Sequence, residues 1–203
     1  SLSIEGATDL QRVDAGEFAR GGAFKADGVV SAFRFLKHGF ALTARAEAIQ
    51  PQVEAVARNS FQIGFEQLTL TAQVDYMIRK AGVFTLRLAL PDGYKVEGVS
   101  GNGIAQWNEK PAPRTLEVNL KERTLGSYRL AVTLVKTHKE LPKTIDLTGA
   151  TPVEVQKLTG FVSVTSEAGV AVRTTTFDGL TEIPAAVLGE GKPSGGGSVL
   201  AYK

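Results

Sequence analysis

The chain has 203 residues, of which 43% are hydrophobic and 22% are charged, and its formal net charge at pH 7 is +2. This balance is ordinary for a globular protein and argues against intrinsic disorder, while the mild, scattered positive charge argues against a nucleic-acid-binding surface. The absence of cysteine excludes disulfides, zinc–thiolate sites and thiol nucleophiles.

No apolar run is long enough to span a bilayer, and no signal peptide is recognisable at the start. Because the sequence begins with Ser1 rather than Met, we expect a piece of a longer polypeptide or a processed form of one.

The first 63 residues predict a small β-sheet region. Residues 1–27 carry short apolar patches between glycines, which indicate one or two edge strands with loops. Strands are predicted at residues 29–36 and 40–49 from their alternating side chains. High alanine content leaves a helix as an alternative over residues 41–58, but Pro51 lies in its middle and cannot continue a helix there. We therefore predict two strands joined at residues 50–52.

The most regular pattern lies between Phe65 and Lys136, where apolar residues occupy even positions in run after run. They are Leu68, Leu70, Ala72, Val74, Tyr76 and Ile78, then Phe84, Leu86, Leu88 and Leu90, then Leu116, Val118 and Leu120, and finally Tyr128, Leu130, Val132 and Leu134. Successive side chains of a strand point to opposite faces, so each run predicts a strand with one dry and one solvated face. Leu88 and Val132 are expected to be fully buried in the same core, and Leu86 and Leu130 are expected to face it as well.

Turn residues separate these runs and indicate antiparallel hairpins. We predict turns at Lys80-Ala81-Gly82, Pro91-Asp92-Gly93 and Gly101-Asn102-Gly103, and a loop over residues 121–127.

The alternation is weaker after His138. Strands are predicted at residues 144–147, 153–158, 161–165 and 170–177, and a helical turn at 183–188. Residues 191–197 have the composition of a linker or of a long hairpin loop, and residues 198–202 predict a last strand.

About a dozen short strands with frequent turns predict an all-β fold, an antiparallel multi-stranded β-sandwich of two packed sheets with little helix. We place the domain boundary at residue 63, with a smaller sheet over 1–63 and the main sandwich over 64–203. One continuous domain remains the alternative.

The sequence contains no motif that carries chemistry. His38 and His138 each lie beside a lysine at a predicted strand end, where an exposed loop histidine is the simplest interpretation. The segment Gly98-Val99-Ser100-Gly101-Asn102 comes nearest to a nucleophile elbow, but Asn102 replaces the last glycine and the segment predicts a hairpin. We therefore expect no catalytic, metal-binding or cofactor-binding residues and no enzyme activity in this chain.

Trp107 and Tyr94 are the only candidates for a ligand site. Trp107 is the only tryptophan, and Tyr94 is predicted to lie on the neighbouring strand, across the turn at Asn102-Gly103. Exposed rings on a sandwich could stack on sugars, although tryptophan is buried on average and a core position for Trp107 is the alternative.

The segments around Ala81-Gly82-Val83-Phe84, Leu90-Pro91-Asp92-Gly93-Tyr94 and Gly126-Ser127-Tyr128 resemble a β module of the extracytoplasmic regions of large, uncharacterised bacterial envelope proteins. The Leu-Pro-x-Gly turn more loosely resembles the amino-terminal all-β domains of zinc aminopeptidases, but no His-Glu-x-x-His motif follows. Either resemblance covers about a third of the chain, and the first implies an extracytoplasmic location.

These observations predict a non-catalytic structural or interaction module of a larger bacterial envelope protein. Its expected partners are another protein or other domains of the same polypeptide, with no nucleic acid and no membrane span. The alternatives are a carbohydrate-binding module that uses Trp107 and Tyr94, and an accessory β domain of an enzyme whose catalytic part lies elsewhere.

Overall fold

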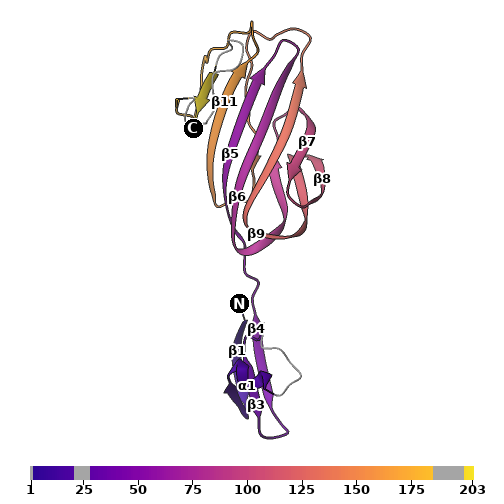
Figure 1. Ribbon diagram of the computed structural model, residues 1–203, viewed down its shortest axis with the longest axis vertical. Helices are drawn as coiled ribbons and strands as arrows, with labels where there is room; N and C mark the ends of the chain where they lie inside the picture. Colours follow the sequence, from indigo (N-terminus) through magenta and orange to yellow (C-terminus); the bar gives the residue numbers. More distant parts are fainter. Residues whose placement is uncertain (1, 21–27, 185–198) are drawn as a thin grey trace. The chain divides into compact units, whose positions relative to one another are not determined.

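The computed structural model describes residues 2–20, 28–184 and 199–203, and the predicted linker at 191–197 lies outside them (Figure 1). The chain divides into two compact units, Ser1–Ile49 and Gln50–Lys203. The sequence-based boundary at residue 63 would separate residues 52–63 from the larger unit, but these residues form a strand within its sheet.

The amino-terminal unit consists of two small antiparallel ladders and one short helix. Its elements are β1 (Leu2–Thr8) paired with β4 (Ala41–Ala46), β2 (Leu10–Val13) paired with β3 (Ala32–Phe35), and α1 (Ala15–Ala19). The carboxylate of Asp14 accepts a hydrogen bond of 2.7 Å from the N–H of Gly16 and so caps α1. The helix considered for residues 41–58 does not form.

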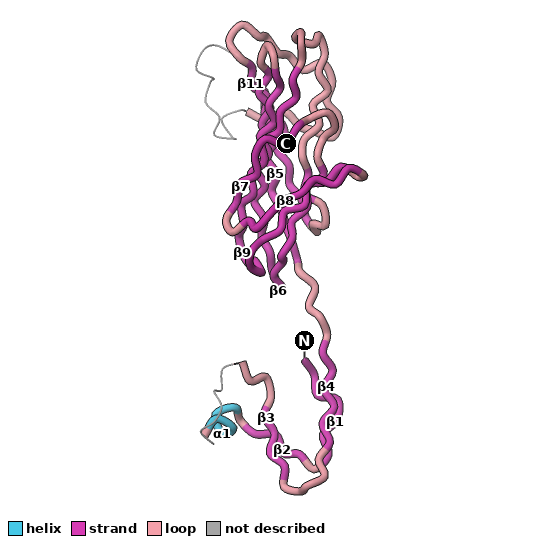
Figure 2. The backbone as a smooth tube through the Cα atoms, turned by 90° about the vertical axis from the view of Figure 1, so that its right-hand side faces the viewer, coloured by secondary structure: helices cyan, strands magenta, loops and turns pink. Residues whose placement is uncertain are grey.

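The larger unit is almost entirely strand, and the described helix is confined to the amino-terminal unit (Figure 2). Its strands are β5 (Gln52–Ile63), β6 (Gln67–Ala89), β7 (Lys95–Gly101), β8 (Ile104–Pro111), β9 (Arg114–Thr137), β10 (Thr151–Pro152), β11 (Lys157–Ser166) and β12 (Val199–Tyr202).

Strands β6 and β9 pair antiparallel over nearly their whole lengths and form one long ribbon. The predicted turn at 80–82 and the predicted loop at 121–127 are therefore wrong, because each lies within a single strand that bends there. Lys80 has a positive φ of 66°, and the β6–β9 register shifts between Ile78 and Thr85, with no β9 partner for residues 79–82. Such an irregularity bends a strand.

The bend folds the sheet over itself into two layers. Layer one has the order β12-β11-β5-β6-β9-β7 and uses the first half of β6 and the second half of β9. Layer two contains β10 and β8 on either side of the second half of β6 and the first half of β9. In Figure 1 the ribbon turns at the lower end of the unit and returns behind the front strands. The predicted all-β sandwich is confirmed.

The core lies between the layers and follows the predicted even positions except at Phe84, which lies at the bend and is 55% exposed. Leu88, Leu130 and Val132 have no exposed surface, and Leu86 is 4% exposed. All four belong to one apolar cluster, so the predicted assignment of faces is confirmed.

The connection after β9 departs from the prediction. Residues 144–147 and 170–177 form no strands, and residues 138–150 instead carry the chain from β9 in layer one to β10, which pairs with β6 in layer two. Strand β11 then runs parallel to β5, the one parallel pair among the described strands. Crossing between layers rather than pairing beside a neighbour explains why alternation is weak here.

Candidate functional site

The two aromatic residues predicted to bind a ligand lie in different environments. Trp107 lies in β8 and is 41% exposed, whereas Tyr94, just before β7, is 7% exposed. The Nζ atom of Lys136 lies 5.9 Å from the centroid of the Tyr94 ring, and burial raises the pKa of the Tyr94 hydroxyl to about 12. Stacking on a sugar needs an open ring face, and the ring of Tyr94 is buried. The structure therefore does not present Tyr94 and Trp107 as an exposed pair.

The two histidines lie in different units and differ in exposure. His38 belongs to the amino-terminal unit and is exposed. His138 is partly buried rather than exposed. Its Nε2 atom lies 3.1 Å from the carbonyl oxygen of Gly64. Within the described ranges, no group of three or more His, Cys, Asp or Glu side chains could hold a metal ion.

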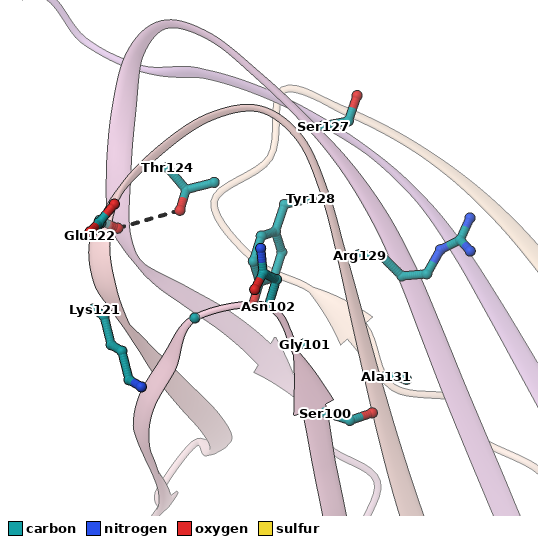
Figure 3. Close-up of a pocket in the computed structure, with 11 residues that line it drawn as sticks. Ser100, Gly101, Asn102, Lys121, Glu122, Thr124, Ser127, Tyr128, Arg129 and Ala131 are labelled. Carbon is teal, nitrogen blue, oxygen red and sulfur yellow. Dashed lines mark hydrogen bonds between the residues drawn. The ribbon is translucent and has the colours of Figure 1, made fainter.

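A cleft of about 620 Å³ lies in the larger unit between the β7–β8 turn and the bend of β9 (Figure 3). Residues 100–103 line one side, and residues of β9 between Lys121 and Ala131 line the other. A Cβ atom on Gly101 would lie 2.5 Å from the Tyr128 hydroxyl oxygen. Glycine is therefore required where β7 meets the Tyr128 side chain.

The polar groups around this cleft do not converge on one point. Arg129 points away from it (Figure 3), and its Nε donates a hydrogen bond of 2.6 Å to Asp75 Oδ1. Lys121 and Glu122 point in different directions. Burial raises the pKa of the Tyr128 hydroxyl above its ordinary value. The lining residues therefore supply no matched acid, base and nucleophile of the kind that catalysis needs.

Ion pairs cover the outer faces of both layers. On layer one, Asp75 accepts hydrogen bonds from Arg129 and Arg58. Burial acts to raise the pKa of Asp75, but these two bonds outweigh it and lower that pKa below its ordinary value. On layer two, Glu117 accepts from Lys110 and Arg87, and those bonds lower the pKa of Glu117.

The sheet edges differ in how well they are covered. Residues 181–183 bond to the outer edge of β12 through the backbone of Thr181, Ile183 and Lys203. Strand β10 has two residues, and β7 carries a register shift between Val96 and Gly98, which weakens an edge as a template for pairing. Strands β7 and β8 each pair with β9 alone among the described strands, and β8 also carries a register shift, between Ile104 and Gln106. What distinguishes β8 is that it has eight residues and is exposed along almost its whole length.

Comparisons with known proteins give only distant structural neighbours. No protein-family model matches the chain, and no curated protein matches it. A crystal structure of an M1 zinc metallopeptidase from Deinococcus radiodurans is 16% identical over 75% of this chain, with a TM-score of 0.42. A non-cellulosomal cohesin from Archaeoglobus fulgidus is 13% identical over 56% of this chain and 91% of its own, with a TM-score of 0.34. The chain spans 38% of the length of that peptidase chain.

Two features of the larger unit were missed by sequence reasoning. Asn59 is buried, and its side chain bonds to both the N–H and the carbonyl of Ala150. The edge position of β8 was also missed. The polar composition of residues 105–110 and the two prolines that follow are the signals that could have indicated an edge strand. In the described part of the chain, no helix is long and apolar enough to cross a membrane.

Proposed function

We propose that the larger unit is a non-catalytic interaction module that binds a protein partner along the edge of β8. The observation that carries this proposal is the contrast between the ion-paired faces of both layers and the exposed β8 edge that bears Trp107. An unpaired strand edge presents backbone donors and acceptors to which an extended segment can add. We further propose that this module belongs to a larger bacterial envelope protein and acts outside the cytoplasm, on the resemblance of the segments 81–84, 90–94 and 126–128 to such proteins.

The proposal can be tested with a photo-crosslinking amino acid at two glutamines of the full-length protein in its source cells. Gln106 lies in the exposed β8 edge strand, whereas Gln73 lies in β6 between β5 and β9. We expect crosslinks to protein from position 106 and few from position 73. Equal crosslinking at both positions, or none at 106, would overturn the proposal. Fractionation of the same cells tests the location.

Carbohydrate binding is kept as a second candidate because the Trp107 ring is exposed. Its test is binding to insoluble polysaccharides and glycan arrays, repeated with Trp107→Ala. Saturable binding that disappears in this variant would favour the carbohydrate module over the protein-binding edge.

A further inference from the structure

The backbone groups that β8 presents to solvent follow from the phase of its pairing with β9. The N–H of Leu90 in the turn after β6 donates to the carbonyl of Arg114, so Arg114 directs its backbone groups toward β6. Along a strand, the backbone N–H and C=O groups of successive residues point to opposite edges. The backbone groups of Thr115, Glu117 and Asn119 therefore point toward β8. Their partners Lys110, Asn108 and Gln106 are thus engaged with β9, and the residues between them direct their N–H and C=O groups outward.

The outward-facing part of β8 is short and is centred on Trp107. In the regular part of the strand, the backbone N–H and C=O groups of Trp107 and Glu109 point away from β9. Pro111, the next outward position, has no N–H to donate, and the register shifts between Ile104 and Gln106 at the other end. The edge that can accept a new strand therefore runs from about Ala105 to Glu109.

This window can pair antiparallel with a second copy of itself in a register centred on Trp107. In a two-fold pair centred on Trp107, this residue faces its own copy, Ala105 faces Glu109, and Gln106 faces Asn108. Lys110 then faces Ile104. No like charges are opposed in this register, and like charges directly opposite one another would destabilise a ladder.

The Trp107 side chain lies on the core-facing side of β8. In a two-fold pair, both Trp107 rings would therefore lie on the same side of the joined strands and cover one another. Trp107 pairs with Val118, which has no exposed surface, and cross-strand partners share a face. The Trp107 ring therefore lies at the margin of the core-facing side of layer two, at the outermost strand of the unit (Figure 1). Aromatic pairs across a ladder add stability beyond the area they bury.

We infer that the partner bound along β8 is a second copy of this chain, paired antiparallel through Ala105–Glu109 with the two Trp107 rings in contact at the two-fold axis. This inference rests on the proposed function and names its partner. One strand pair and one ring pair bury less than a standard interface of about 1,600 Å², so the dimer is weak and reversible. A symmetric pair also satisfies the outward N–H and C=O of Trp107 on both copies at once.

The experiment uses Trp107 as its own reporter, because it is the only tryptophan in the chain. Sedimentation and tryptophan emission are measured on the full chain from about 1 µM to about 1 mM, the range in which weak complexes form. We expect the sedimenting mass to double and the emission to move to shorter wavelength over the same concentrations. A single mass with unchanged emission across this range would overturn the inference.

Two substitutions at Glu109 separate backbone pairing from side-chain effects. Glu109→Pro removes an outward N–H without breaking the ladder with β9, while Glu109→Ala keeps that N–H and loses only the ion pair with Arg114. We expect Glu109→Pro to abolish doubling of the mass and Glu109→Ala to retain it. Equal loss in both variants would overturn strand pairing as the cause. A chain that stays monomeric while Gln106 crosslinks to a different protein would overturn the inference and leave the proposed function standing.

Discussion

The two units of the chain contain similar strands but differ in what covers them. In the larger unit, layer two covers the inner face of layer one, and Leu88, Leu116, Leu130 and Leu134 have no exposed surface. In the amino-terminal unit, every residue of β4 is exposed, and Ala32 is the only hydrophobic residue buried among the described side chains. Two-stranded ladders have no second layer to cover them and are only marginally stable alone.

The difference shows that alternation predicts a strand without predicting burial. Residues 40–49 alternate like residues 68–78, and both segments form strands. Only the second segment pairs with a neighbour on both sides and is covered by another layer. Apolar residues such as Leu42, Phe40 and Phe35 consequently remain 44–55% exposed in the amino-terminal unit.

The sharpest way to break this comparison is to shorten a matched leucine in each unit. Leu88→Ala removes a fully buried side chain and should lower the free energy of unfolding of the larger unit by about 2–5 kcal/mol. Leu42→Ala, at a position 44% exposed, should cost less than about 1 kcal/mol. Urea denaturation followed by far-ultraviolet circular dichroism measures both.

A control at the neighbouring position tests the assignment of faces. Arg87 lies on the outer face of layer two beside Glu117 and Glu154, so Arg87→Ala should cost less than about 1 kcal/mol, as exposed ion pairs contribute little. Losses of similar size for Leu88→Ala and Arg87→Ala would contradict the two-layer core.

A second test concerns the buried polar anchor of the larger unit, which has no described counterpart in the amino-terminal unit. Asn59 is 6% exposed, accepts from the Ala150 N–H at 2.9 Å and donates to the Ala150 carbonyl at 3.1 Å. Asn59→Ala leaves both backbone groups without these bonds and should lower the free energy of unfolding by about 1–3 kcal/mol. Denaturation of the purified variant checks this value.

The residue beside this anchor offers an independent perturbation. A Cβ atom on Gly149 would lie 2.6 Å from the Asn59 amide, so Gly149→Ala should also destabilise the larger unit. Because the two substitutions disturb one contact, their combined cost should fall short of the sum. Full additivity would mean that Asn59 and residues 149–150 act separately.

The third prediction concerns the aromatic stack of the amino-terminal unit. The rings of Phe35 and Phe40 lie 4.8 Å apart at 26°, and both are about half exposed. Phe35→Ala should cost that unit about 0.5–1.5 kcal/mol and leave the urea midpoint of the larger unit unchanged. Hydrogen exchange, read separately for β3 and β6, distinguishes the two effects. A matching loss of protection in β6 would contradict the independence of the units.

Sequence reasoning predicted which residues form strands better than it predicted where one strand ends and the next begins. Burial at the even positions of residues 68–78, 86–90, 116–120 and 128–134 was predicted correctly because a strand with one dry face must alternate. Phe84, which was assigned to the same dry face, is 55% exposed. The turn at Lys80–Gly82 was wrong because a glycine can mark either a hairpin turn or a bend within one strand, and composition alone does not distinguish the two. Trp107 was correctly placed on a strand, but its exposure depends on β8 being an edge, and strand order is a tertiary property. The buried bond between Asn59 and Ala150 joins residues 91 positions apart, which no local pattern could indicate.

The smallest expected change in the free energy of unfolding comes from removing one charged side chain in each unit. Hydrogen bonds from Arg129 and Arg58 hold the pKa of Asp75 below its ordinary value despite the opposing effect of burial. A lowered pKa in the folded state stabilises folding at pH values above the unfolded pKa of about 3.9, and this contribution is lost as the pH falls through the lower, folded value. Asp75→Asn should therefore cost less than about 1 kcal/mol at pH 7, and its difference from the unsubstituted chain should shrink below about pH 4.

Denaturation midpoints of both proteins between about pH 2 and pH 7 test this sign. The matching change in the amino-terminal unit, Glu17→Gln, removes a pair with Arg34 at 3.5 Å between side chains that are 47% and 51% exposed. It should change stability less than Asp75→Asn, because Asp75 is held by two arginines on a ladder fixed by a core, whereas Glu17 lies on a five-residue helix with no buried residue. A larger effect from Glu17 would mean that charged contacts, rather than covered strands, hold the smaller unit together.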